Sequence, residues 1–361
     1  MEGAVVARCG RKRTRNRKAR KCKSFALRHC RPVRDMAAVG QRLVACMLNI
    51  SEARGRDVVA QVAHAAIACR GGQWREGTTV LNVFSDEEYN RSVITIVARI
   101  DVIGEAVLAA CERACGLIDM TAHAGIHPCM GSVDLVPFYP LGEKVGLEEC
   151  ATEARALALA LTSRVDGTSA FFFGSADVPR NRGLAQRRRE MGWFKKVVDM
   201  STIHPDVGPS PQRRYGLTGV GASPYVMNCN VTIDTQDLAV GRKVAAALRE
   251  SGEAGLPGIQ VLALPHEGAV EIACNVKSIP CSSSWAGTVP WPAFSISGRA
   301  YHHVPARLIT ARVAQLAGTH GVAVRGTALV GFTPRECRVL AEWALTLGIG
   351  EFWTKQHQLY M

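Results

Sequence analysis

The chain of 361 residues lacks any apolar run that approaches the roughly 20 residues of a membrane-spanning helix. It also lacks the apolar leader of a secretory signal peptide, and its 13 cysteines are odd in number and irregularly spaced. These absences argue against a membrane span and against a disulfide framework. With 47% hydrophobic residues the chain can bury a substantial core, so we expect a globular protein of two domains or subdomains.

Acidic residues are almost missing from one segment. Residues 1–35 contain 13 of the 44 Lys and Arg but only two of the 31 Asp and Glu, and the remaining chain carries just +2 of the net charge of +13. A nucleic-acid-binding body is therefore not expected, since its basic residues would have to lie on the folded part. A block of like charge is expected to be disordered.

Three interpretations of this basic arm stay open: a nuclear-targeting or nucleic-acid-binding arm, a mitochondrial transit peptide, and a non-functional extension before a natural start at Met36. We expect a cytoplasmic protein, or a mitochondrial or nuclear one if the arm is a targeting signal.

Five potential metal ligands lie close together in the sequence, namely Cys111, Cys115, His123, His127 and Cys129. A zinc finger needs about 12 residues between its second cysteine and its first histidine. Here seven residues separate them, and the two cysteines fall at i and i+4 of an amphipathic helical run, where small apolar residues are expected in any case. We therefore predict no metal site.

Strand and helix patterns alternate from residue 43 onward. Spacing and residue type predict strands at 43–50, 79–84, 92–98, 133–139 and 170–174, and helices at 56–69, 103–117, 147–161 and 183–194. The last of these helices is short and basic. Together they give a β-α-β-β-α-β order with appended elements.

The second half repeats this order. Its predicted strands are 225–233, 260–264, 270–276 and 326–330, and its predicted helices are 236–249, 306–317 and 334–347. We predict an α/β (α+β) fold of two ferredoxin-like βαββαβ sandwiches side by side with a cleft between them. The expected parts are a disordered extension over 1–35, subdomains over 36–222 and 223–361, and an atypical insert at 277–303. The connector 203–223 is rich in Pro and Gly, so we expect a ligand-binding loop rather than a core element.

One short stretch places imidazoles between a helix and a strand. In LIDMTAHAGIHPCMGSVDLVPF, residues 117–138, Pro128 pushes His127 into an extended conformation. Gly125 and Gly131 on either side allow a sharp turn. The imidazole of His127 is therefore expected at the lip of the following strand.

This stretch carries a resemblance to a known family. Together with LVACMLNISEA at 43–53 and the NRS of residues 90–92, it resembles the formiminotransferase (glutamate formimidoyltransferase) domain. The similarity runs over about 43–278 and 304–332, with the motifs in the family's order. It implies transfer of a formimidoyl group from N-formimidoyl-L-glutamate to tetrahydrofolate as co-substrate, with both small molecules bound between two α/β sandwiches. It also makes a homodimer a candidate assembly.

The resemblance implies roles for particular residues. The histidine before the proline is the family's catalytic residue, so His127 is expected to act as general acid and base, because an imidazole can take the folate nitrogen's proton and protonate the departing amine. The motifs further imply substrate contacts at Asn49, Ser51 and Asn90, and chemistry suggests a substrate carboxylate at Arg91. The family's folate-binding stretch maps onto Gly208, Pro209, Ser210, Arg213, Arg214, Tyr215 and Gly216.

The chain departs from the family pattern at several places. Ile126 and Cys129 stand where the family commonly has Glu and Arg, the folate stretch is one residue shorter, and residues 277–303 match nothing in the family. No cyclodeaminase region follows in this chain, so we expect a stand-alone transferase domain. Two functions remain open: a folate-dependent one-carbon transferase, and a catalytically weakened paralogue that acts as a folate-binding or protein-interaction module.

Overall fold

The computed structural model describes residues 42–355 except 70, 195–198, 254 and 282–290. All described residues belong to one compact unit, Val33–Met361. The predictions for the basic arm and for a start at Met36 concern residues outside this described part. None of the described helices is both long enough and apolar enough to cross a membrane.

The first half of the chain builds a six-stranded sheet with the strand order β2-β3-β1-β4-β6-β5. Its first four strands are antiparallel neighbours, whereas β6 runs parallel to both β4 and β5. The strands are β1 (Leu43–Ile50), β2 (Thr78–Asp86), β3 (Arg91–Arg99), β4 (Val133–Pro140), β5 (Ala170–Gly174) and β6 (Thr218–Ala222). The helices are α2 (Arg56–Ile67), α3 (Ile100–Leu117), α4 (Leu147–Arg164) and the short α5 (Leu184–Glu190).

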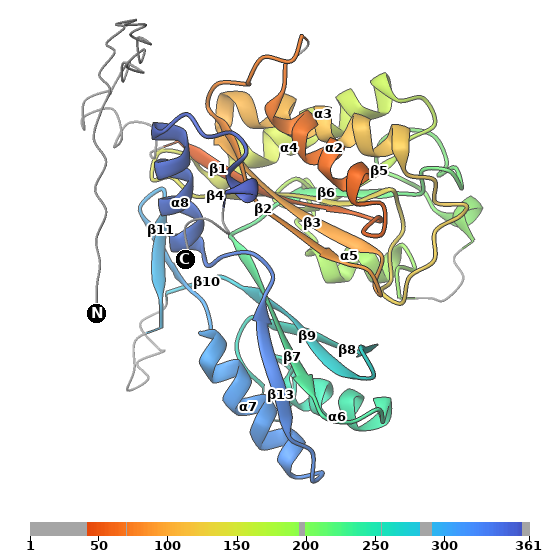
Figure 1. Cartoon of the computed structure of the whole chain (residues 1–361), viewed down its shortest axis with the longest axis vertical. Helices are drawn as coiled ribbons and strands as arrows, with labels where there is room; N and C mark the ends of the chain where they lie inside the picture. The colour runs from red at the N-terminus through yellow and green to blue at the C-terminus, as the bar shows by residue number, and fades with distance from the viewer. Residues whose placement is uncertain (1–41, 70, 195–198, 254, 282–290, 356–361) are drawn as a thin grey trace, which may run out of the picture. The chain divides into compact units, whose positions relative to one another are not determined.

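Strand β1 shows why this sheet is the centre of the fold. Its even-numbered residues, Val44 to Ile50, pack into a core with α2, α3 and α4, which cover one face of the sheet (Figure 1). Its odd-numbered residues Leu43, Ala45 and Met47 belong to a second core that includes the second sheet. Because successive side chains of a strand point to opposite faces, β1 is buried on both sides.

The second half forms a four-stranded antiparallel sheet with the order β13-β7-β9-β8. Its elements are β7 (Val226–Ile233), α6 (Leu238–Leu248), β8 (Ile259–His266), β9 (Ala269–Lys277), α7 (Ala306–Gly318) and β13 (Val324–Leu329). The order of these elements along the chain and the order of their strands in the sheet follow the βαββαβ pattern. In the first sheet, β1 to β4 with α2 and α3 follow the same pattern. The predicted α+β class with two ferredoxin-like units is confirmed. The division at residues 222 and 223 stays a prediction.

Strand β6 contradicts the prediction that the connector 203–223 holds no core element. Its residues alternate Val220 and Ala222 toward the helices with Gly219 and Gly221 on the other face. A Cβ atom at either glycine would meet Phe171 or Phe173 of the neighbouring β5 at under 3 Å. The glycines therefore make room for two phenyl rings. Because the segment is rich in glycine, its composition did not indicate a buried strand.

The insert at 277–303, for which the sequence predicts no helix or strand, contains three short strands. Strands β10 (Ile279–Pro280), β11 (Ala293–Ile296) and β12 (Arg299–His302) form a small antiparallel sheet, while residues 282–290 lie outside the described part. The strands are only two to four residues long, which is too short for their alternation to be visible in sequence.

The last described segment returns to the first sheet. Helix α8 (Pro334–Thr346) packs against β2, and the short turn of helix η2 (Phe352–Thr354) follows it. The N–H group of Val80 in β2 donates to the carbonyl of Gly350 at 2.9 Å, and the Thr79 hydroxyl donates to the same carbonyl at 3.2 Å. The chain thereby covers the outer edge of the six-stranded sheet.

Replacing Gly221 by Ala should destabilise the protein, because the new Cβ would lie 2.4 Å from the carbonyl oxygen of Phe173. We expect a loss of about 1–3 kcal/mol in the free energy of unfolding, measured by urea denaturation. Gly326→Ala is the control, since nothing lies within 4 Å of that position, and it should change stability by at most about 0.5 kcal/mol. Equal effects of both variants would contradict the packing role of β6.

Candidate functional site

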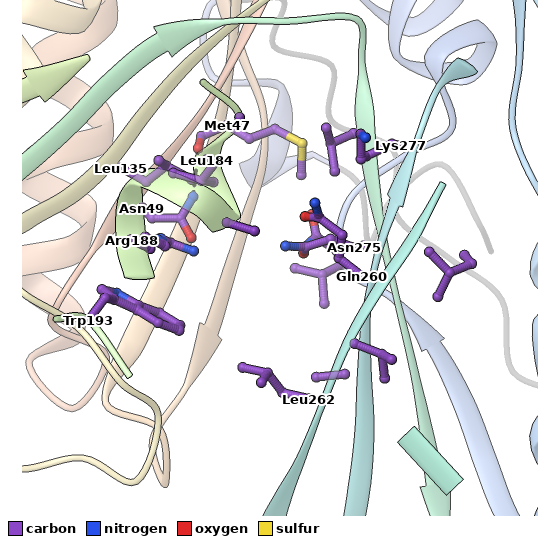
Figure 2. A pocket seen from close by; sticks show the side chains of 18 of the residues that line it. Met47, Asn49, Leu135, Leu184, Arg188, Trp193, Gln260, Leu262, Asn275 and Lys277 are labelled. Carbon is purple, nitrogen blue, oxygen red and sulfur yellow. Dashed lines mark hydrogen bonds between the residues drawn. The ribbon is translucent and has the colours of Figure 1, made fainter. Parts of the chain in front are cut away.

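A cavity of about 700 Å³ lies between the two sheets, on the faces that their helices leave uncovered. One wall comes from β1 to β5, α5 and the segment that follows α5, and the opposite wall from β7, β8 and β9. Figure 2 shows Asn49, Leu135, Arg188 and Trp193 on one side, with Gln260, Leu262 and Asn275 reaching toward them from the other. Ligand pockets are commonly of this size and placed between subdomains.

A buried carboxylate organises the first wall. Asp134 of β4 is 2% exposed, and its Oδ2 accepts hydrogen bonds from Arg91 of β3 at 2.8 Å and Arg188 of α5 at 2.9 Å. Its Oδ1 accepts from the backbone N–H of Met130 at 2.8 Å and from the indole of Trp193 at 3.4 Å. Burial opposes ionisation of Asp134, but the two arginines outweigh burial and hold its pKa below the usual value.

The two arginines are held firmly on the cavity side of Asp134. Arg91 also donates to the Oδ1 of Asn49 at 2.8 Å, and the guanidinium of Arg188 lies over the Trp193 ring, 4.2 Å from its centroid. Burial is the main reason that the pKa of Arg188 falls to about 10. Both side chains line the cavity, so Arg91 is a buried, paired cation rather than an exposed turn residue.

His127 lies in the same wall. Its ring contacts those of Tyr89 and Trp193, at centroid distances of 5.3 and 5.7 Å. Its Nδ1 lies 2.8 Å from the carbonyl of Pro128. A carbonyl only accepts, so Nδ1 carries the proton and Nε2 is the unprotonated nitrogen. Burial, followed by the positive charge of Arg91, lowers the pKa of His127 to about 3, so the imidazole is neutral at physiological pH.

The loop that carries His127 is tied down by the other predicted motif residues. The Ser51 hydroxyl donates to the carbonyl of Gly131 at 2.7 Å, and the side-chain Nδ2 of Asn90 lies 3.4 Å from the Nδ1 of His123. A Cβ at Gly125 would lie 2.2 Å from the carbonyl oxygen of Tyr89. This glycine is thus required for close backbone approach rather than for an unusual turn.

A second polar cluster joins the two sheets beside the cavity. His266 of β8 lies 2.7 Å from Asp86 of β2, and the Tyr89 hydroxyl donates to Glu271 of β9 at 2.8 Å. Asn230 also donates to Glu271, at 2.9 Å. Burial lowers the pKa of His266, but the bond to Asp86 and the charges of Asp86 and Glu271 outweigh burial and raise it overall.

The wall formed by the second sheet is rich in amides. Asn228 of β7 donates to the Oδ1 of Asn275 on β9 at 2.7 Å, and Gln260 and Lys277 line the cavity near them. Amide groups both donate and accept, so this wall suits a polar heterocycle with both kinds of hydrogen-bonding group. The wall formed by the first sheet is therefore cationic, and the opposite wall of the cavity is rich in amides.

Of the residues predicted from sequence, three line the cavity: His127, Asn49 and Arg91. Ser51 and Asn90 instead brace the loop behind it. The predicted folate stretch lies elsewhere, with Arg214 paired to Asp119 at 2.5 Å and Tyr215 packed against the core beneath the helices. The cavity lining contains none of its residues, which are Gly208, Pro209, Ser210, Arg213, Arg214, Tyr215 and Gly216. Folate binding by this stretch stays a prediction without support from the cavity.

Sequence reasoning missed Asp134, Arg188 and Trp193 as members of the site. Asp134 stands as the single charge in the apolar strand 133–140, which was the available signal, since buried carboxylates require partners. Among the described residues no group of three or more His, Cys, Asp and Glu is arranged to hold a metal ion, and Cys111 and Cys115 are buried in α3.

Comparison of the sequence with known proteins identifies the family. The family model for the formiminotransferase domain, N-terminal subdomain, matches residues 43–223. The chain belongs to the formiminotransferase family. A glutamate formimidoyltransferase of Thermoplasma acidophilum is 30% identical to it over 241 residues, or 65% of this formiminotransferase chain and 77% of the relative.

Two further relatives extend the comparison. A formiminotransferase cyclodeaminase-like protein of Arabidopsis thaliana is 29% identical over 254 residues, covering 65% of this chain and 82% of the relative. A formimidoyltransferase-cyclodeaminase of Gallus gallus is 26% identical over 333 residues, covering 89% of this chain and 54% of the relative. The family resemblance that the motifs indicate is confirmed.

Asp134→Ala should be strongly destabilising in this formiminotransferase domain, because it leaves two buried arginines without a counter-charge. We expect a loss of about 3–5 kcal/mol in the free energy of unfolding. Asp119→Ala, which removes the exposed partner of Arg214, is the matched control and should have little effect. Because the pKa of Asp134 is depressed, its contribution is present above the unfolded pKa of about 3.9 and is lost as pH falls through the folded pKa. If the difference in the free energy of unfolding between wild type and Asp134→Ala did not change in the acid pH range, the assignment would be wrong.

The His266 cluster should stabilise the protein more at low pH than at high pH. His266 faces the carboxylates of Asp86, Glu271 and Glu267 and the ring of Tyr89. Its folded pKa lies above the unfolded value of about 6.5, so its contribution is complete below that pH and disappears as pH rises through the folded pKa.

Urea unfolding of wild type and the His266→Gln variant over a pH series tests this expectation. The stability difference should be largest in weak acid and shrink toward alkaline pH. His320→Gln is the control, since His320 is exposed and pairs with no acid among the described residues. A difference that grows with pH would show that the charged imidazole is not what holds the two sheets together.

Proposed function

We propose that this formiminotransferase domain transfers a formimidoyl group from N-formimidoyl-L-glutamate to tetrahydrofolate in the cavity between its two sheets. The observation that supports this function is the state of His127. Its Nε2 is unprotonated, has no hydrogen-bond partner among the described residues, and belongs to a side chain that lines the cavity beside Arg91. The names of the curated relatives point in the same direction.

His127 is the proposed proton carrier. As the folate nitrogen attacks the formimidoyl carbon, a new C–N bond forms and that nitrogen loses its proton to Nε2. The bond between the carbon and the glutamate nitrogen then breaks, and the imidazolium returns the proton to the leaving amine. The Pro128 carbonyl holds the Nδ1–H throughout, which fixes the tautomer and orients the ring.

The two walls suit the two substrates. The arginines beside Asp134 provide positive charge for carboxylates, and both substrates carry carboxylates. The amide wall with Asn228 and Asn275 offers donors and acceptors to a heterocycle such as the pterin ring.

A second function remains a candidate because of what surrounds His127. Burial, followed by the positive charge of Arg91, lowers its pKa to about 3, and Ile126 and Cys129 supply neither a carboxylate to offset that effect nor a cation. A base this weak slows proton transfer. The alternative is a domain that binds folate without turnover and serves as a binding or interaction module.

Thermal unfolding with and without tetrahydrofolate, followed by a transfer assay with N-formimidoyl-L-glutamate, separates the two functions. Tetrahydrofolate at 100 times its dissociation constant should add about 2.7 kcal/mol of stability under either. His127→Ala should reduce turnover by about 10²- to 10⁴-fold under the transferase function and leave the thermal shift nearly unchanged.

His320→Ala is the control for this experiment, because His320 is exposed and lies after α7, outside the cavity lining. A thermal shift without turnover in wild type would favour the binding module. No shift at saturating tetrahydrofolate would contradict both the transferase and a folate-binding module, and would leave a protein-interaction module.

A further inference from the structure

The cluster around Asp134 carries more positive than negative charge. Two arginines, Arg91 and Arg188, share a single carboxylate and donate to the same oxygen of it. The other oxygen of Asp134 is already occupied by the N–H groups of Met130 and Trp193. The carboxylate can accept no further hydrogen bond, and no second acid pairs with either arginine in the described part of the chain, so the cluster has one positive charge in excess.

The guanidinium groups also have hydrogen-bonding capacity left over. Nη1 of Arg91 is buried and has no partner among the described residues. Among the described residues Arg188 donates one hydrogen bond, to Asp134, although a guanidinium carries five N–H donors. Both residues are at most 8% exposed, and both line the cavity. Buried charge without a partner is costly, so such a pair is poised to accept an anion.

We propose that Arg91 and Arg188 form a binding site for a ligand carboxylate in the cavity wall beside His127, with Asn49 and Asp134 as the residues that position them. The planar fork of a guanidinium matches a carboxylate with two parallel hydrogen bonds. Asn49 fixes Arg91 through its Oδ1 and donates its own Nδ2 to the Met47 carbonyl at 2.8 Å. The naming of the natural ligand rests on the proposed function: the carboxylate belongs either to the formimidoyl donor or to the glutamyl end of folate.

A bound carboxylate at this site changes the environment of His127. The positive charge of Arg91 is, after burial, the largest influence that lowers the pKa of His127. An anion between the arginines opposes that charge, so the imidazole becomes a stronger base when the site is filled. Substrate binding and base strength are thereby coupled through Arg91 and Arg188.

The binding test uses the full chain and glutarate, a dicarboxylate with no amine and no transferable group, in isothermal titration calorimetry. Arg188→Met and Arg91→Met should each weaken glutarate binding by about 10- to 100-fold, as expected for loss of a charge-assisted hydrogen bond. Asp134 keeps one arginine in either variant, so no buried carboxylate is left alone, and thermal unfolding verifies folding. Arg188→Lys is a second variant that keeps the charge and loses the fork.

Arg189→Met is the matched control, since Arg189 is exposed at the same cavity and its loss changes the net charge equally. It should weaken glutarate binding by less than about threefold. Equal losses in Arg189→Met and Arg188→Met would overturn the site and indicate only long-range attraction. Absence of glutarate binding to wild type at millimolar concentrations would overturn it too.

Steady-state kinetics distinguishes the source of the carboxylate. If the donor supplies it, Arg188→Met raises the KM for N-formimidoyl-L-glutamate and not for tetrahydrofolate, and the reverse holds if folate supplies it. Unchanged KM values for both substrates in an active enzyme would overturn the site while leaving the proposed function intact. Glutarate binding that depends on Arg188 in a protein without turnover would support the site and refute the transferase.

Discussion

The carboxylate of Asp134 is the constraint on which the rest of the site depends. Strand β4 places it in the sheet, and its four hydrogen bonds reach β3, α5, the loop before β4 and the segment after α5. Three regions of the chain, around residues 91, 130–134 and 188–193, are thereby fixed relative to one another by a single side chain. Since a buried carboxylate is tolerated only with such partners, the shape of the cationic wall and its charge are set together.

The second sheet completes the site rather than merely covering it. The second core extends from the face of β1 that the helices leave uncovered to β7 and β9. Tyr225 is buried in this core, and its hydroxyl donates to the Phe332 carbonyl at 3.0 Å. On another side, His266 and Glu271 meet Asp86 and Tyr89 of the first sheet. Apolar packing and a charged cluster together determine the spacing of the two walls, which neither sheet can set alone.

Much of the fold could be predicted from sequence, because most strands and helices have the expected period. Strand β6 could not, because its two glycines are explained only by the phenyl rings of β5 that pack over them. In the site, the motifs around His127, Asn49 and Arg91 indicated the correct wall. Arg188 was predicted only as part of a basic helix, and nothing local distinguishes it from the exposed Arg189 beside it. Whether an arginine of a helix is buried depends on the carboxylate that meets it, which lies 54 positions away in the chain.

The covering of strand β2 has a consequence for how the protein is made. The six-stranded sheet is complete in sequence once β6 has been synthesised, yet the groups that protect its outer edge come from Gly350 and its neighbours, 271 positions after Thr79. On the ribosome the first sheet therefore has an uncovered edge strand throughout the synthesis of the second, when pairing with another nascent chain is most harmful. The edge is covered only after the residues around Gly350 have been synthesised, so the interval of risk is as long as the synthesis of the second unit.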